Sequence, residues 1–319
     1  MQFFQLIGTQ RSGSNLFRLM LNEFDDIYAP HPPHLLSTFY HLQKNYNDFD
    51  KLVSDMVKWV KFNPIEWNNV PSEKTIKNHI KDNNIFEVFR VIYTHSNPKF
   101  WCCKSLQNFR FNNDPNFMKL QPIYIYIYRD GRDVASSFKK ASIGEKHIYN
   151  IAKQWNEDQR KCLEIKKSTK NFNFFSVKYE DLLSDPALII NNFCKKYGLS
   201  YNKKFLNYYK SKESKKASTS GGLWRNLSKP LIRNNKNKYK SELSTKEILI
   251  FESINKKELQ KLGYELVNSD SKLFSSFTSG EINKFNLINS DLKKEAYENQ
   301  NDFEKELIKK QKIIISKNS

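Results

Sequence analysis

The chain has 319 residues and a formal net charge of +19, with a pI near 9.5 and a mean hydropathy of −0.71. No apolar run approaches the about 18 residues of a transmembrane helix, so we expect no membrane span. A chain of this length can form one large α/β domain. The positive charge alone is compatible with nucleic acid. The Lys residues are widely spread and accompany abundant Asn and Ile, so we expect no nucleic-acid partner.

The cysteines and the first residues of the chain indicate the cellular compartment of the protein. The four Cys include the adjacent Cys102 and Cys103, in a predicted buried strand, and they make no disulfide framework. The chain enters its first strand directly after Met1, without the charged and apolar regions of a secretory signal. Both features favour a cytoplasmic protein.

The first segment combines an apolar strand, a glycine-bearing loop and an amphipathic helix. A strand is predicted over 2–8, the loop contains Gly8 and Gly13, and apolar residues at helical spacing predict a helix over 14–24. Such a loop directs backbone N–H groups and the positive end of the helix dipole at one spot. This arrangement suits a phosphate, although a purely structural junction between strand and helix remains an alternative.

The loop departs from an ATP or GTP site at its end. It has the Gly-x4-Gly frame of a P-loop, but Ser14 and Asn15 stand where Lys and Ser or Thr are required. The cation is Arg11, inside the loop. We interpret this as a cradle for a phosphorylated nucleotide other than a triphosphate on Mg²⁺.

A second phosphate-type element lies far along the chain. The uncharged run at 123–128 predicts a strand buried on both faces, and Arg129 follows it directly. Arg129 is therefore expected at the carboxyl edge of a central strand, where open α/β sheets bind ligands. Ser137, one turn inside the helix predicted over 132–141, can present its hydroxyl to the same anion. In the alternative interpretation, Arg129 and Asp133 form a structural ion pair.

Together these elements resemble the sulfotransferase family that uses 3′-phosphoadenosine 5′-phosphosulfate (PAPS). The loop is similar to the family's 5′-phosphosulfate loop, and Arg129 with Ser137 matches its 3′-phosphate pair. Tyr179, in the sequence VKYEDLLSDP, matches a Tyr near the adenine, and Trp224-Arg225 resembles a lid segment of bacterial members. The resemblance implies that PAPS is bound by Arg11, Ser12, Gly13, Ser14, Asn15, Arg129, Ser137, Tyr179, Trp224 and Arg225.

The resemblance spans roughly residues 2 to 266 and implies the fold. We expect an α/β protein with three layers, in which helices flank a mostly parallel central sheet, in the P-loop NTPase-like sulfotransferase fold. Strands predicted over 2–8, 99–104, 122–129 and 172–178 alternate with helical stretches, as this fold requires. We assign residues 1–267 to the sulfotransferase domain and residues 268–319 to a polar, helical C-terminal extension, with a charged helix over 291–312.

Sulfuryl transfer depends mostly on positioning and on stabilising charge that develops on a bridging oxygen. Arg11 is placed to stabilise the leaving 5′-phosphate. Lys104, after the strand-like residues 100–103, matches a Lys that the family keeps near the sulfuryl group. No metal is expected, because the six His and four Cys fall in no ligand spacing.

The acceptor hydroxyl must also lose a proton, so a base is required. Animal cytosolic members carry a His just beyond the Lys that matches Lys104, and this chain has none there. His34, in a Pro-rich turn after the first helix, corresponds best to the base of other branches, and His31 is second. The alternative is that both His belong to a structural surface loop.

The segment 215–229, with Gly221 and Gly222, is predicted to close over the bound nucleotide, unless Trp224 belongs permanently to the core. The expected function is transfer of a sulfuryl group from PAPS to a hydroxyl or amine of an unidentified acceptor, such as a carbohydrate or another small metabolite. A P-loop kinase of small metabolites and a non-enzymatic basic nucleic-acid-binding module remain alternatives. The sequence does not specify an oligomeric state.

Overall fold

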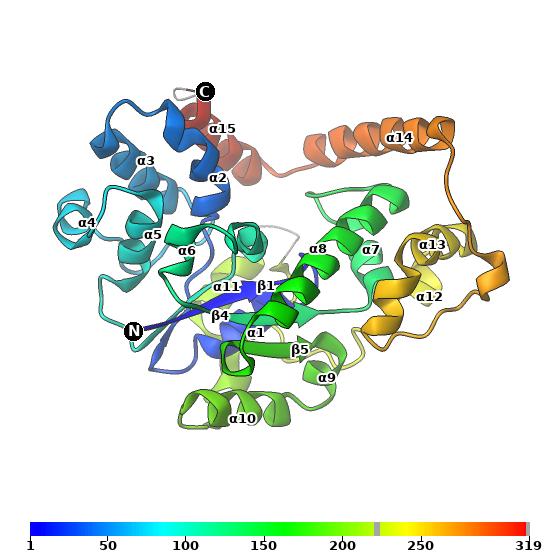
Figure 1. The fold of residues 1–319 in the computed structure, drawn as a ribbon, viewed down its shortest axis with the longest axis horizontal. Helices are drawn as coiled ribbons and strands as arrows, with labels where there is room; N and C mark the ends of the chain where they lie inside the picture. Colours follow the sequence, from blue (N-terminus) through cyan, green and yellow to red (C-terminus); the bar gives the residue numbers. More distant parts are fainter. Residues whose placement is uncertain (220–223, 317–319) are drawn as a thin grey trace.

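The computed structural model describes residues 1–219 and 224–316. A sheet of five parallel strands lies at its centre, in the order β2-β3-β1-β4-β5 (Figure 1). The strand that precedes the glycine loop, β1, is therefore the middle strand. The strands are β1 (Gln2–Ile7), β2 (Ile27–Tyr28), β3 (Phe100–Cys103), β4 (Pro122–Tyr128) and β5 (Phe174–Lys178).

Helices fill the connections between the strands. Before β4 the chain forms α1 (Ser14–Leu21), α2 (Leu35–Leu42), α3 (Phe49–Lys61), α4 (Glu73–His79), α5 (Ile85–Thr94), the 3-10 helix η2 (Leu106–Phe111) and α6 (Pro115–Met118). After β4 it forms α7 (Gly131–Lys139), α8 (Ile148–Ser168), α9 (Tyr179–Ser184), α10 (Pro186–Tyr197), the 3-10 helix η4 (Lys203–Lys210), α11 (Lys212–Thr219), α12 (Tyr239–Glu242), α13 (Thr245–Lys261), α14 (Ser279–Glu298) and α15 (Asp302–Ser316).

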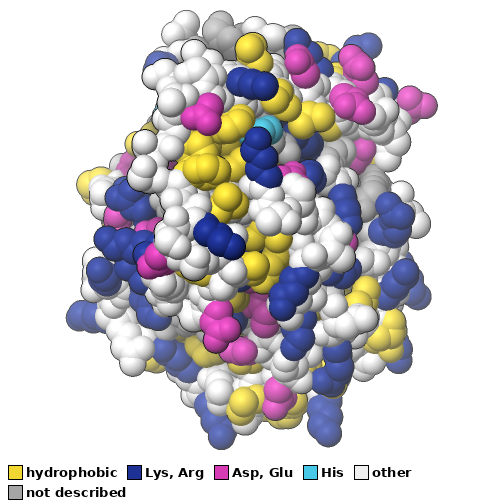
Figure 2. Space-filling model, turned by 90° about the vertical axis from the view of Figure 1, so that its right-hand side faces the viewer, with side chains coloured by type: hydrophobic (Ala, Val, Ile, Leu, Met, Phe, Trp, Pro, Cys, Tyr) yellow, Lys and Arg dark blue, Asp and Glu magenta, His cyan; other side chains and the backbone are white. Residues whose placement is uncertain are grey.

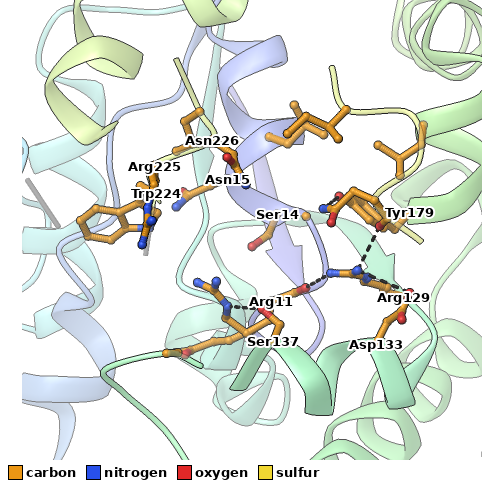
Figure 3. Close-up of a pocket in the computed structure, with 18 of the residues that line it drawn as sticks. Arg11, Ser14, Asn15, Arg129, Asp133, Ser137, Tyr179, Trp224, Arg225 and Asn226 are labelled. Atoms are coloured by element: carbon orange, nitrogen blue, oxygen red, sulfur yellow. Dashed lines mark hydrogen bonds and ion pairs between the residues drawn. The ribbon is translucent and has the colours of Figure 1, made fainter. Parts of the chain in front are cut away.

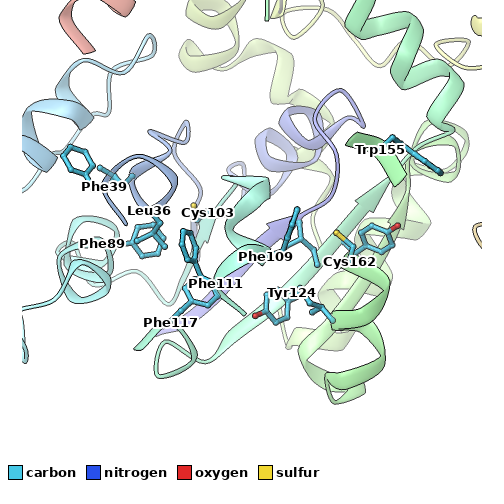
Figure 4. Packing of buried hydrophobic residues seen from close by; sticks show 14 of the residues in the cluster. Leu36, Phe39, Phe89, Cys103, Phe109, Phe111, Phe117, Tyr124, Trp155 and Cys162 are labelled. Atoms are coloured by element: carbon cyan, nitrogen blue, oxygen red, sulfur yellow. The ribbon is translucent and has the colours of Figure 1, made fainter. Parts of the chain in front are cut away.

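The two faces of the sheet are buried under different helices. Phe3 and Tyr124 point to one face and pack with residues of α2, α5, α8 and α13, partly shown in Figure 4. Phe4 and Ile125 point to the other face and pack with residues of α1, α9 and α10. Because both faces are covered, the strands are mostly apolar, with Gln5 of β1 as a buried exception. The expected three-layer α/β fold is confirmed.

Two expectations about single elements were wrong. The helix expected over 181–197 is broken at Asp185, whose side chain accepts a hydrogen bond from the Leu188 N–H while Pro186 begins α10. The single helix expected over 291–312 is two helices, α14 and α15. Asn301 separates them, because its Oδ1 accepts from the Glu304 N–H at 2.8 Å and so competes with a continuous helix.

The C-terminal helices contact the rest of the protein. Asn289 of α14 accepts hydrogen bonds from the backbone N–H groups of Lys146 and His147, at 2.8 and 2.9 Å, beside the start of α8. In Figure 1, α15 lies beside α2 and α3. Among the described residues, no helix combines the length and the apolar character needed to cross a membrane.

Candidate functional site

The carboxyl ends of β1, β3, β4 and β5 meet at one edge of the sheet, because all four strands are parallel. The loops that follow them surround a cavity of about 400 Å³. The cavity is lined, among others, by these residues expected from the sequence: Arg11, Gly13, Ser14, Asn15, His31, His34, Lys104, Arg129, Ser137, Tyr179, Trp224 and Arg225. Ser12 alone of the expected residues is not in the lining, and its side chain is buried.

The loop after β1 is shaped by two glycines. A Cβ on Gly8 would lie 2.2 Å from the Ile127 carbonyl oxygen, so the loop can approach β4 only without a side chain there. Gly13 begins α1 with a φ of 87°, and a Cβ on it would lie 2.3 Å from the ring of Tyr179. The Tyr179 ring therefore packs directly on the loop that the sequence identified.

Arg11 and Ser137 are brought together, although they come from different motifs. The Nε of Arg11 donates a hydrogen bond of 2.9 Å to Ser137 Oγ (Figure 3). Burial and the charge of Arg129 lower the pKa of Arg11. Ser137 was expected to act on the same anion as Arg129. In the structure its hydroxyl accepts from Arg11, and its role toward the 3′-phosphate stays a prediction.

Arg129 lies at the other side of the loop, over the Tyr179 ring at 4.7 Å from its centroid. It donates to the Arg11 carbonyl at 3.3 Å and to the Asn235 carbonyl at 3.0 Å. It also forms an ion pair of 3.4 Å with Asp133. The structural ion pair that was the alternative interpretation of these two residues is therefore present. Its Nε is buried without a hydrogen-bond partner among the described residues. This donor is available to a ligand.

A late segment of the chain closes this side of the cavity. Asp133 accepts from the backbone N–H groups of Asn237 and Tyr239, at 2.8 and 2.9 Å. The side-chain amide of Asn235 donates to the Tyr179 hydroxyl at 2.7 Å. These hydrogen bonds hold residues 235–239 against α7, beside Arg129.

Lys104 follows β3 and lines the cavity, near enough to Arg11 to feel its charge. Burial and the neighbouring charges of Arg18 and Arg11 lower the pKa of Lys104 to about 7. Arg18 lies on α1, is fully buried, and donates to the Ala29 carbonyl at 2.7 Å. It also forms an ion pair of 2.7 Å with Glu213 of α11. The sequence analysis did not identify Arg18, which looks like an ordinary polar residue of an amphipathic helix.

The tautomer of His31 follows from its contacts. Asn63 uses its amide NH₂ to donate to the His31 carbonyl at 2.8 Å, so its Oδ1 faces the ring and accepts from Nδ1 at 2.7 Å. The proton is thus on Nδ1 and Nε2 carries a lone pair. This Nε2 is buried and has no hydrogen-bond partner in the described chain. Burial and the charges of Arg18 and Lys104 hold the pKa of His31 well below its usual range.

His34 begins α2 with a φ of 56°, an unusual conformation for a residue with a side chain. It lines the cavity and is exposed at the surface. Desolvation and the charge of Lys104 lower the pKa of His34 to about 4. Both His31 and His34 are therefore neutral at pH 7, as a proton acceptor must be.

The segment around Trp224 and Arg225 lies on one side of the loop in Figure 3, while Arg129 and Tyr179 lie on the other. The Trp224 ring packs edge-on against His31, with ring centroids 5.0 Å apart. Gly221 and Gly222 of the expected lid lie outside the described residues. Closure of the lid stays a prediction.

Several lining residues were not predicted, among them Gln10, Tyr208 and Asn235. Asn235 lies within the Lys-rich stretch 233–240, but one Asn in an Asn-rich chain gives no local signal. Tyr208 lies on η4, which packs on α1. No sequence pattern predicts this packing.

Comparisons with known proteins agree with this architecture. The structure resembles the sulfotransferase domain of the Synechococcus PCC 7002 olefin synthase, with a TM-score of 0.58 and 19% identity over 83% of this chain and 95% of that domain. It also resembles the sulfotransferase domain from the curacin biosynthetic pathway, with a TM-score of 0.53 and 19% identity over 83% of this chain and 98% of that domain. At such identities the likeness concerns the fold.

The sequence was also compared with protein families and with curated proteins. No curated protein matches the chain. The family described as the sulfotransferase family matches residues 4–203, which is more than half of the chain and includes the glycine loop, Lys104, Arg129 and Tyr179. The protein thus belongs to the sulfotransferase family.

Proposed function

We propose that the protein transfers a sulfuryl group from PAPS to a hydroxyl or amine of an acceptor. The observation that carries this proposal is the separation of cations around one cavity. Arg11 and Lys104 both line the cavity and lie close enough for their charges to interact. In Figure 3, the guanidinium of Arg129 lies on the other side of the loop from that of Arg11. A nucleotide with anionic groups at both its 3′ and 5′ positions requires two such clusters.

The 5′-phosphosulfate occupies the loop in this proposal. Backbone N–H groups at the start of α1, Ser14 and Asn15 surround the phosphate, while Arg11 and Lys104 neutralise its charge. Arg129 holds the 3′-phosphate through its unpartnered Nε, with Tyr179 beside the adenine.

The acceptor oxygen attacks sulfur, and the bond from sulfur to the bridging oxygen breaks. The electron pair stays on the 5′-phosphate, where Arg11 and Lys104 stabilise it. The hydroxyl proton passes to the neutral imidazole of His34, and His31 is the second candidate for this role.

A kinase requires carboxylates that are free to hold Mg²⁺. Among the described residues, the carboxylates that line the cavity are Asp133 and Glu242. Asp133 accepts from two backbone N–H groups, and Glu242 pairs with Lys140 at 2.6 Å. Both are engaged, which disfavours this alternative.

A nucleic-acid-binding module favours a continuous basic surface. On the face shown in Figure 2, Lys and Arg side chains are spread among acidic and hydrophobic ones. The surface charge is mixed, whereas Arg11, Lys104 and Arg129 all line one cavity. This arrangement supports binding of a small anionic ligand better than binding of a polyanion. Four free, buried Cys support a reducing compartment such as the cytoplasm.

The test is sulfuryl transfer from ³⁵S-labelled PAPS, measured as label on an acceptor and as release of adenosine 3′,5′-bisphosphate. Lys104→Met should lower turnover by about 10²–10³, the scale for loss of one group that stabilises developing charge. Lys99→Met is the matched control, because Lys99 precedes the opposite end of β3 and pairs with Asp26 at the surface. Equal turnover of Lys104→Met and wild type would contradict the proposal.

A further inference from the structure

A second, smaller cavity adjoins the nucleotide cavity. Its volume is about 200 Å³, and Gln10 and His34 line both cavities. The imidazole of His34 thus stands between the two spaces. The remaining walls come from α2 and from the start of η2, namely Ser37, Ser105, Leu106, Gln107 and Asn108.

The walls of this cavity are polar and carry no formal charge apart from any proton on His34. No Lys, Arg, Asp or Glu is in the described lining, in a protein with a net charge of +19. Leu106 is the single apolar side chain of the described lining. Amide and hydroxyl groups can both donate and accept hydrogen bonds, so these walls suit a ligand that does the same.

Two wall residues have buried polar atoms with unused hydrogen-bonding capacity. Asn108 is 1% exposed, and its Oδ1 has no hydrogen-bond partner within the described chain. Ser105 is 3% exposed, and among the described residues its Oγ contacts the weakly bonding thiol of Cys103 and has no other hydrogen-bond partner. Leaving a buried polar atom unpaired is costly, so such atoms in a cavity wall indicate a missing partner.

The wall is held rigidly by the central strand. The side-chain amide of Gln5, on β1, donates to the carbonyls of Cys103 and Ser105 at 3.2 and 3.0 Å. Its Oε1 accepts from the amide nitrogen of Asn108 at 3.0 Å. This network uses the nitrogen end of Asn108, while its oxygen end has no hydrogen-bond partner among the described residues, in a residue that lines the cavity.

We propose that this cavity binds the acceptor, and that the acceptor is an uncharged polyhydroxylated compound with the size of about one sugar ring. The inference rests on the proposed function and adds the substrate class. The volume lies below the about 300 Å³ at which pockets for drug-sized ligands begin. A steroid or phenol would leave the polar atoms of Ser105 and Asn108 unpaired, and a charged sugar would lack a counter-ion.

The reaction in this geometry is a simple exchange. One hydroxyl of the polyol lies at His34 and forms the new oxygen–sulfur bond, while the bond from sulfur to the 5′-phosphate oxygen of PAPS breaks. The hydroxyl proton goes to His34, and the products are a sulfate monoester and adenosine 3′,5′-bisphosphate. The neighbouring hydroxyls bond to Asn108, Ser105 and Gln107.

The first experiment measures binding without chemistry. Saturation-transfer NMR with methyl α-D-glucopyranoside and myo-inositol should show contact with the wild-type protein. Gln107→Leu should weaken this contact by about tenfold, the scale of one lost hydrogen bond. Among the described residues, the side chain of Gln107 makes no hydrogen bond to the core, so the variant should fold. Asn113→Leu is the control, since Asn113 is exposed and outside the lining.

The second experiment measures transfer from PAPS to these two polyols, to glucuronate, to glucosamine and to 4-nitrophenol. The polyols should be the best acceptors, and Gln107→Leu should raise their KM without changing affinity for adenosine 3′,5′-bisphosphate. Nucleotide binding combined with preferred transfer to 4-nitrophenol or a charged sugar would overturn this inference alone. Absence of nucleotide binding would overturn the proposed function. Absence of polyol contact, or an equal effect of Asn113→Leu, would overturn the acceptor cavity.

Discussion

Arg11 Nε donates a hydrogen bond of 2.9 Å to Ser137 Oγ, joining the loop after β1 to helix α7. The two residues come from separate sequence motifs, at the two phosphate-type elements of the chain. The contact fixes the direction of a guanidinium whose backbone has a φ of 69°. The orientation of the loop cation therefore depends on a hydroxyl contributed by the second motif.

Removing that hydroxyl should weaken nucleotide binding. Ser137→Ala removes the hydroxyl that accepts from Arg11 Nε, and a hydrogen bond to a charged group contributes about 1.5–3 kcal/mol. We expect a loss of this size in the calorimetric affinity for adenosine 3′,5′-bisphosphate. Ser137→Thr, which keeps the hydroxyl, serves as the control. Equal losses for both substitutions would show that packing, rather than the hydrogen bond, is responsible.

Loss of the proposed base should affect turnover more than binding. His34→Ala should lower kcat by about 10²–10⁴, while nucleotide affinity stays close to that of the wild type. His31→Ala should do less, because its ring packs edge-on against Trp224 and its Nδ1 is held by Asn63. Steady-state kinetics of the two variants separate the roles. Near-normal kcat in both would place the base elsewhere.

The pH profile of kcat/KM should be bell-shaped. The lowered pKa of His34, about 4, means that the imidazole is an available base above that pH, so the rate rises through it. The lowered pKa of Lys104, about 7, means that its positive charge is lost as pH rises further, so the rate falls above neutrality. Lys104→Met should abolish the alkaline limb while keeping the acid limb. A wild-type rate that stays constant from pH 7 to 10 would contradict this assignment.

Gly13 should tolerate no side chain. Gly13→Ala places a methyl group 2.3 Å from the ring of Tyr179, at a φ of 87°. We expect the free energy of unfolding to fall by about 1–3 kcal/mol and nucleotide affinity to fall with it. Gly198→Ala is the control, since it also has a positive φ but no atom within 4 Å of the added carbon. Denaturant unfolding of both variants separates the clash from backbone strain, and equal destabilisation would exclude the clash.

The sequence predicted those parts of the site that lie on contiguous motifs at strand ends. The loop at Arg11, the cation at Arg129 and the lysine at Lys104 each follow an apolar run, so their meeting at one sheet edge follows from parallel pairing. The same argument predicted the layers of the fold, which needs only strands that alternate with helices.

Other parts depend on tertiary packing and left no local pattern. Arg18 is buried because Glu213, far along the chain, pairs with it. Asn235 reaches the site because Asp133 accepts hydrogen bonds from the backbone N–H groups of Asn237 and Tyr239, which follow Asn235. The proposed acceptor cavity combines α2 with η2, and the polarity of its walls becomes visible only when the two are packed together.

The most direct test of the central claim compares adenosine 3′,5′-bisphosphate with AMP by isothermal titration calorimetry. The account predicts tight binding of the bisphosphate and much weaker binding of AMP, because Arg129 contributes about 1.5–3 kcal/mol through the 3′-phosphate. Arg129→Ala should remove most of this difference, while binding of AMP changes little. Equal affinity of the wild-type protein for the two nucleotides would contradict the account.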